Sequence, residues 1–306
     1  MSQATPELVE VACALCGAAR RREVFQDAPY KVWRCIECEL VYVSPRIPDD
    51  WLIDTVYNAT YWRSEAPRDR GYADYLTDEK AARRTWSRRW KALAEWWPAS
   101  GSVLDVGCAN GGFLDHARNQ GLSPYGLEPS LAAHTRAIDR IGAHRVIRKD
   151  LGTASAVRPD GWPTHFDLVT MWDVLEHLPD PVGALRQAGE LLAPGGRVVV
   201  ETQDVGSRFA RLLGRRWHHY KHVEHLMHFD KSTLEQALAA AGLRALSWTR
   251  RGAGKSVRLS FLIERSARVA PWMPRLLSPL LRLGNPLFYV NPCDEWIVVA
   301  EPIEPA

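Results

Sequence analysis

The stretch VLDVGCANGGFL, residues 103–114, decides the fold. Residues 103–106 form a short β-rich run, which predicts a buried strand. The glycine-rich GCANGG follows and predicts a tight turn, and apolar residues then recur with helical spacing from Phe113 to Ala117. A strand, a glycine-rich turn and a helix make the first half of a βαβ unit. The sequence therefore predicts an α/β fold with a largely parallel sheet.

The second predicted strand ends in an acid. Residues 124–127 form this strand, and Glu128 follows it, twenty-three residues after Asp105. A carboxylate in this place can accept hydrogen bonds from both ribose hydroxyls of an adenosine. The glycines are spaced G-x-x-x-G-G, unlike the G-x-G-x-x-G turn that binds a pyrophosphate, and Asp105 would repel a diphosphate. A nucleoside with positive charge fits better, and S-adenosylmethionine carries both an ammonium and a sulfonium.

Five motifs follow one another between residues 103 and 202: VLDVGCANGGFL, GLEPS, KDL, FDLVTMWDVLEHLPDP and LLAPGGRVVVET. In this order and spacing they resemble the motifs of class I S-adenosylmethionine-dependent methyltransferases. The resemblance implies a doubly wound, Rossmann-like sheet of seven strands. Two of these strands are expected near residues 245–249 and 296–300, and the last is expected to be antiparallel.

The same resemblance implies which residues hold the cofactor. Its methionyl part would lie on the first strand and the turn, at Asp105, Gly107, Cys108, Asn110 and Gly112. Glu128 would bind the ribose, Asp150 would bind the adenine amino group, and Leu151 would pack on the adenine ring. Trp172 and Asp173 would border the methyl group. Asp150 has an alternative role, because aspartate also favours the N-cap of a helix.

Four of the six cysteines form two C-x-x-C pairs that are separated by eighteen residues: Cys13, Cys16, Cys35 and Cys38. This spacing is typical of thiolates that close a tetrahedral zinc site. Four thiolates leave no open position for water, so the ion would be structural and would fold a small N-terminal zinc ribbon. The alternatives are redox thiols and scattered buried cysteines.

These placements predict three parts of the chain: a zinc ribbon over residues 1–46, connecting or lid helices over 47–100, and a methyltransferase domain over 101–306. In the second part, Tyr61, Tyr72 and Tyr75 are candidates to cover the cofactor. A helical insertion is expected at about 251–292, which could wall the acceptor pocket, form a dimer face or rest on a membrane surface.

An amphipathic helix is predicted over residues 79–97. Trp86, Trp90, Leu93 and Trp97 share one side, whereas the basic residues mostly occupy the other: Arg83, Arg84, Arg88, Arg89 and Lys91. The favoured interpretation is an aromatic stripe that packs on the domain and a basic face in water. The alternative is a basic face that grips a phosphate-bearing substrate.

Residues 211–246 contain five of the ten histidines: His218, His219, His222, His225 and His228. This stretch resembles bacterial methyltransferases that also carry an N-terminal zinc ribbon and often modify sugars, glycans or secondary metabolites. The matching pattern is Trp217, Glu224, His225 and Phe229. Methyl transfer to an alcohol needs removal of the hydroxyl proton, and histidine suits that role. His225 is the first candidate for the base, and His222 and Tyr72 are weaker candidates.

A catalytic divalent cation is a further possibility. Asp173, Glu176 and His177 stand at i, i+3 and i+4 and would share one face of a helix after the fourth strand. They could hold an ion that lowers the pKa of the acceptor hydroxyl, with His225 completing the site. The pattern is similar to the acid-x-x-Glu-His motif of metal-dependent small-RNA and quinone-precursor O-methyltransferases, although here Asp173 occupies the first place.

Composition limits the class of protein. Hydrophobic residues make up 46% and charged residues 25%, as in ordinary globular domains, and a net charge of only +3 makes nucleic acid a secondary hypothesis. No membrane-length apolar run and no secretory pattern in residues 1–10 occur, so a cytoplasmic location is expected. The sequence thus predicts O-methylation of a sugar, glycan or other secondary metabolite. The alternatives are RNA methylation, C- or N-methylation of a small molecule, and a nonreactive interaction protein.

Overall fold

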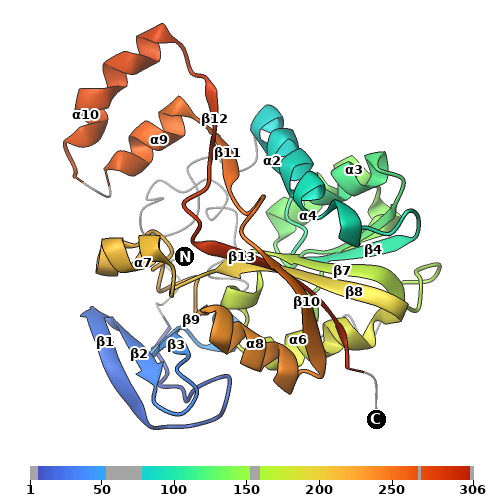
Figure 1. Cartoon of the computed structure of the whole chain (residues 1–306), viewed down its shortest axis with the longest axis horizontal. Coiled ribbons are helices and arrows are strands. Elements are labelled where there is room, and N and C mark those ends of the chain that lie inside the picture. Colours follow the sequence, from blue (N-terminus) through green and yellow to red (C-terminus); the bar gives the residue numbers. More distant parts are fainter. Residues whose placement is uncertain (1–5, 53–77, 152–158, 268–269, 304–306) are drawn as a thin grey trace.

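A computed structural model describes residues 6–52, 78–151, 159–267 and 270–303. It contains a central sheet with helices on both faces, a small N-terminal module at one end and a helical hairpin that projects beside α2 (Figure 1). Among the described residues, no helix combines the length and the apolar character needed to cross a membrane.

The central sheet has seven strands. Their order across the sheet is β10 (Leu243–Thr249), β13 (Glu295–Pro302), β8 (Leu192–Gln203), β7 (Phe166–Trp172), β4 (Ser102–Val106), β5 (Ser123–Leu127) and β6 (Val146–Ile147). The five strands from β8 to β6 are parallel, whereas β13 runs antiparallel to both β8 and β10. The doubly wound sheet and its antiparallel last strand are confirmed.

Helices cover both faces of this sheet, and the strands alternate between two cores. Successive residues of β4 show this, since Val103 packs with α3 (Gly112–Asn119) and α4 (Leu131–Ile141) whereas Leu104 packs with α6 (Pro181–Glu190) and α8 (Lys231–Ala240). The helix starts follow from local chemistry. Asp180 and Asp230 cap α6 and α8 by accepting hydrogen bonds from backbone N–H groups.

The N-terminal module shares a sheet with the rest of the chain. Its strands β1 (Arg21–Asp27), β2 (Tyr30–Cys35) and β3 (Val41–Val43) form an antiparallel sheet, and the short helix α1 (Asp49–Trp51) follows. The fourth strand of this sheet is β9 (Met227–His228), which comes from the histidine-rich stretch and pairs with β3. The module is therefore packed against the large domain through both backbone pairing and a common core.

Helix α2 (Glu79–Ala92) departs from the prediction in two ways. It ends at Ala92 rather than at residue 97, and a 3-10 turn follows at Ala94–Trp96. The placement of Arg89 on a solvated basic face is wrong, because Arg89 is buried and donates to Glu201 at 2.6 Å. The expected aromatic packing does occur at Trp90, whose ring stacks on Trp97 with centroids 4.4 Å apart.

The predicted insertion is a β-hairpin with helices at its tip. Strand β11 (Lys255–Arg258) pairs with β12 (Leu287–Val290), and α9 (Leu259–Ser266), α10 (Met273–Leu277) and a 3-10 helix (Ser278–Leu283) lie between them. Strand β11 packs on α2, as Figure 1 also shows. Large apolar side chains are exposed along this segment: Trp272 just before α10, Leu276 on α10, and Leu283 at the end of the 3-10 helix.

Candidate functional site

A cavity of about 560 Å³ lies at the carboxyl ends of β4 and β7. Successive strands are added to the sheet in one direction from β4 to β6 and in the opposite direction from β7 to β8. Open α/β sheets bind ligands at the point between two such halves. Its walls come from the turn before α3, the end of β7, helix α2, and the segment β11–α9. The insertion thus walls the cavity, as one of the three predicted alternatives proposed.

The glycine turn forms one wall, and its shape depends on the absence of side chains. Gly107 has φ +69°, and a Cβ there would lie 2.7 Å from Val174 Cγ2. A Cβ on Gly112 would lie 3.1 Å from Trp86 Nε1, and the backbone N–H of Gly112 donates to Asn110 Oδ1 at 3.2 Å. Cys108 is buried at the same turn. All four of these predicted cofactor residues line the cavity: Gly107, Cys108, Asn110 and Gly112.

Asp105 also lines the cavity, although only 2% of its surface is exposed. Its Oδ1 accepts a hydrogen bond from Thr170 Oγ1 at 2.6 Å. Burial raises the pKa of the Asp105 carboxyl to about 8, because the hydrogen bond from Thr170 and the charge of Arg89 offset only part of the loss of water. A positively charged ligand in the cavity would favour the ionised carboxylate.

The other predicted cofactor residues lie further along the sheet edge and are not among the lining residues of this cavity. Glu128 follows β5 and accepts from the backbone N–H groups of Ala109 and Ser130, both at 2.8 Å. These two hydrogen bonds connect the glycine turn to the GLEPS segment. Burial raises the pKa of Glu128 to about 7. Asp150 and Leu151 follow β6, where Asp150 is half-buried and Leu151 is buried.

Aromatic rings form the floor of the cavity. Trp172, at the end of β7, lies 5.5 Å from Trp86 and 5.2 Å from Phe113 between ring centroids. Phe261 on α9 lines the cavity as well. Such a surface suits the face of a sugar or of an aromatic ring.

A cluster of charged side chains lies beside these aromatic rings, and the sequence analysis missed most of them. Asp173, Glu201 and Glu295 bring their carboxylates together, and the cations that face them are Arg89 and Lys255. Lys255 donates to Asp173 at 2.8 Å and lines the cavity. The sequence does contain a signal for Glu201: it is a charged residue at the carboxyl end of an apolar strand, in the run VVVET.

The expected helix face of Asp173, Glu176 and His177 is wrong. Asp173 has a left-handed φ of 54°, and only a 3-10 turn, Leu175–His177, follows it. The Asp173 carboxylate consequently turns to Lys255. The structure instead gathers Glu176, His177 and His225, whose ligand atoms lie within 4.8 Å of one another. Glu176 in addition accepts from Thr202 Oγ1 at 2.8 Å.

The rings of His177 and His225 are in contact, and only His177 of the two lines the cavity. Their rings meet edge to face with centroids 4.7 Å apart. Nδ1 of His177 lies 2.9 Å from the carbonyl oxygen of Glu224, and Nδ1 of His225 lies 2.7 Å from that of His219. A carbonyl can only accept, so Nδ1 carries the proton and Nε2 is the basic atom. Burial lowers the pKa of both histidines, which keeps them neutral.

The two weaker candidates for the base fare differently. His222 does not line the cavity, because its Nε2 faces Asp27 of the N-terminal module at 3.3 Å and its ring packs near Phe25 and Tyr30. This position corrects its assignment to the acceptor site. Tyr72, like Tyr61 and Tyr75, lies outside the described residues.

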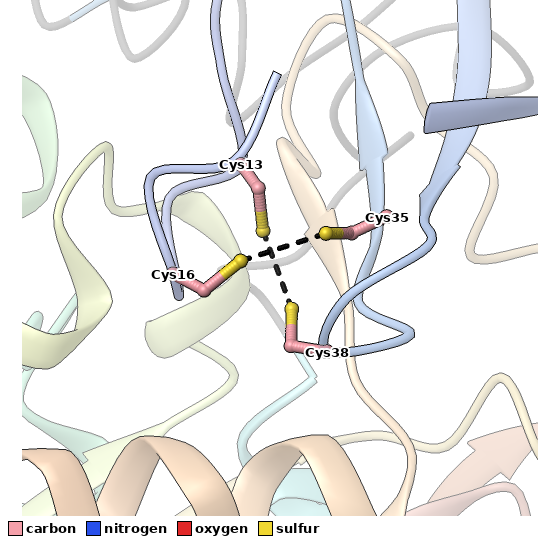
Figure 2. Close-up of side chains that lie close together, drawn as sticks. All are labelled: Cys13, Cys16, Cys35 and Cys38. Carbon is pink, nitrogen blue, oxygen red and sulfur yellow. Dashed lines mark hydrogen bonds between the residues drawn. The ribbon is translucent and has the colours of Figure 1, made fainter. Parts of the chain in front are cut away.

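The four N-terminal cysteines converge as the spacing predicts (Figure 2). Cys13 and Cys38 lie 3.4 Å apart between sulfurs, and Cys16 and Cys35 lie 3.5 Å apart. These separations exceed the roughly 2.05 Å of a disulfide and suit thiolates around one ion. Burial raises the pKa of Cys13 and Cys38, so a cation is needed to hold them as thiolates. The cluster is compatible with zinc.

Comparisons with known proteins agree with this geometry. A ubiquinone biosynthesis O-methyltransferase of Xanthomonas oryzae pv. oryzae is 32% identical over 136 residues, which are 40% of this chain and 56% of that protein. One of Yersinia pestis is 31% identical over 104 residues, 33% of this chain and 41% of that protein. The chain spans about half the length of these curated relatives.

Solved structures share the fold at low sequence identity. The magnesium protoporphyrin IX methyltransferase from Synechocystis PCC 6803, determined with bound SAH, matches with a TM-score of 0.50 and 14% identity over 82% of this chain and 99% of that chain. A family model described as a methyltransferase domain matches residues 78–247, more than half of the sequence. The chain therefore belongs to the methyltransferase-domain family.

Proposed function

We propose that the protein methylates a hydroxyl group of a sugar, glycan or other secondary metabolite that binds in the cavity between α2, β7 and β11–α9. The observation that carries this proposal is the position of His177, a neutral imidazole on the cavity wall beside the aromatic floor. The relatives named as O-methyltransferases support oxygen as the receiving atom.

We propose S-adenosylmethionine as the cofactor, which supplies an electrophilic methyl group when it is bound. Asp105 and the turn from Gly107 to Gly112 would hold its methionyl part, since Asp105 is an acid poised to pair with a cation. Glu128 would bind the ribose, with Asp150 and Leu151 at the adenine. We further propose that the four cysteines hold a structural Zn²⁺, and that the parts of the chain are 1–46, 47–100 and 101–306.

The acceptor hydroxyl would lose its proton to Nε2 of His177. The carbonyl of Glu224 fixes the tautomer and the orientation of that ring, and His225 packs behind it. His225 thus becomes a positioning residue in this proposal. The aromatic floor would hold the acceptor against the methyl group, because in-line transfer needs reacting atoms about 3 to 3.5 Å apart.

A phenolic hydroxyl is the second candidate acceptor. The aromatic lining accommodates a planar ring, and the relatives act in ubiquinone biosynthesis by name. RNA is less well supported, because Arg89 does not contribute to the basic face of α2 and Arg88 packs over the ring of Tyr289.

Substitution His177→Ala tests the proposed base. We expect kcat for the acceptor to fall by about 10²- to 10⁴-fold, the usual contribution of a general base. The Kd for S-adenosylmethionine should stay within about twofold. The acceptor is found first by mass spectrometry, as a gain of one methyl group across a panel of sugars and phenols. The exposed His165→Ala is the matched control. An unchanged kcat in the His177 variant would show that the base lies elsewhere.

Substitution Glu128→Ala tests the proposed cofactor site. Hydrogen bonds to a carboxylate contribute about 1.5 to 3 kcal/mol each, so loss of two ribose contacts should raise the Kd for S-adenosylmethionine about 100-fold or more. Isothermal titration calorimetry measures this constant. Glu235→Ala on the exposed side of α8 should bind the cofactor normally. Near-normal affinity in the Glu128 variant would contradict the ribose role.

A further inference from the structure

A separate group of metal-binding side chains lies where the loop after β8 meets the start of β13. Nε2 of His218 and Nε2 of His219 lie 3.7 and 3.8 Å from the same oxygen, Oδ2 of Asp294. Nε2 of His219 is also 3.5 Å from Oε1 of Glu295. This group shares no residue with the cysteine cluster or with Glu176, His177 and His225.

The distances in this group fit a shared ion better than they fit direct hydrogen bonds. Hydrogen bonds from nitrogen to oxygen are usually about 2.7 to 3.2 Å long, and all three separations are longer. Zn²⁺ lies about 2.0 to 2.2 Å from nitrogen and oxygen ligands, so two ligands of one ion can be up to about 4.2 Å apart. Each of the three measured pairs lies within that limit.

Burial of Asp294 and His219 costs free energy unless an ion replaces the water that these side chains lose. Asp294 is 1% exposed and His219 is 7% exposed. Within the described part of the chain, Nε2 of His219 has no hydrogen-bond partner. A buried nitrogen in that state loses its hydration without compensation, and an ion between the imidazole and the carboxylate would supply what is missing. His218 is half-buried and gives solvent a path to the site.

The carboxylate is also held in place. The indole Nε1 of Trp217 donates to Oδ2 of Asp294 at 2.8 Å. Metal-binding carboxylates are commonly oriented by such a donor. The rings of His218 and His219 are adjacent, with centroids 4.1 Å apart, so both reach the same oxygen from one side.

We propose that His218, His219 and Asp294 bind one divalent transition-metal ion. Two imidazoles and a carboxylate favour Zn²⁺, Co²⁺ or Fe²⁺ over Mg²⁺ and Ca²⁺, which prefer oxygen alone. The ion would fasten the loop to the sheet. The carbonyl of His219 fixes the ring of His225, and this ring packs on His177. The ion would therefore help to hold His177 in its position in the cavity wall. This proposal does not depend on the identity of the acceptor.

The proposal is tested by comparing the zinc content of the full-length wild-type protein with that of full-length variants. Wild type, His219→Gln and His218→Gln are dialysed against Zn²⁺ and then against metal-free buffer, and zinc per chain is measured by mass spectrometry. Each variant should hold one equivalent less than wild type. His165→Gln should match wild type. Equal zinc in wild type and in both variants would overturn the proposal, whatever the cysteines bind.

Cobalt identifies the ligands. Wild type and His219→Gln are prepared with Co²⁺ in place of Zn²⁺, and the cysteine cluster should contribute equally to both spectra. Their difference spectrum should therefore show ligand-field bands without sulfur charge-transfer absorption. Bands of equal strength in His219→Gln would contradict the assignment. Because His218 is half-buried, His218→Gln should keep the wild-type circular dichroism, which separates loss of the ion from loss of the fold.

Discussion

Cys35→Ser is expected to unfold the N-terminal module and to release its metal. Cys35 is completely buried at the end of β2, and its sulfur faces Cys16 in the cluster. A unit of about 40 residues rarely folds on its own core, and structural Zn²⁺ contributes about 10 to 16 kcal/mol in small zinc-binding domains. We expect loss of one zinc per chain and rapid proteolysis within residues 8–46, a larger effect than any single contact in the large domain provides.

The control for this variant is Cys293→Ser, an exposed cysteine outside the cluster. It should keep the metal content and the proteolysis pattern of wild type. Chelation of the wild-type protein should reproduce the behaviour of the Cys35 variant. Retention of zinc and of protease resistance in Cys35→Ser would rule out a structural metal at the four cysteines.

The effect should reach the active site through β9. Strand β3 pairs with β9, and the neighbouring residue Leu226 donates its backbone N–H to the carbonyl of Glu176 at 2.9 Å. Gln203 on β8 donates to the carbonyl of Met227 at 2.9 Å. Loss of the module removes strand β3, with which β9 pairs. Turnover should therefore fall further than cofactor affinity, because Leu226 is bonded to Glu176, the residue before the proposed base His177.

The order of the motifs predicted the fold because each motif indicates a local structure, and their sequence along the chain gives the order of the strands and helices. The run from Val103 to Gly112 has a strand, a turn and a helix start in one stretch, and glycine is needed where a Cβ would meet Val174. The cysteine spacing was equally informative. Four equivalent ligands around one ion leave few arrangements, and the structure brings all four sulfurs together.

The acceptor side was harder to predict because its residues meet only through tertiary packing. Periodicity placed Arg89 in water, since a helical pattern does not distinguish a solvated charge from one that faces Glu201, more than a hundred residues away. The helical spacing of Asp173 and Glu176 was misleading because Asp173 adopts a left-handed φ. Among the histidines, His222 and His225 are close in sequence, yet one faces Asp27 and the other packs on His177.

Arg89→Met is expected to destabilise the large domain by about 3 to 5 kcal/mol, the usual result of leaving one partner of a buried ion pair without the other. Glu201 is fully buried, and Asp173 and Glu295 add negative charge beside it. Burial already raises the pKa of Glu201, and Arg89 opposes that rise. Chemical denaturation measures the change, and the exposed Arg88→Met should lose less than about 1 kcal/mol.

The pH dependence and the double variant distinguish loss of charge from loss of packing. Without Arg89 the pKa of Glu201 rises further above its unfolded value, so the folded state binds a proton that the unfolded state releases. The destabilisation relative to wild type should therefore grow as pH rises above the raised pKa that Glu201 has in folded wild type, and shrink as pH falls. Arg89→Met/Glu201→Met should recover much of the stability, because it removes the uncompensated carboxylate and keeps apolar volume. A pH-independent loss, or a double variant less stable than Arg89→Met, would mean that Arg89 acts mainly by packing between Trp86 and Trp172.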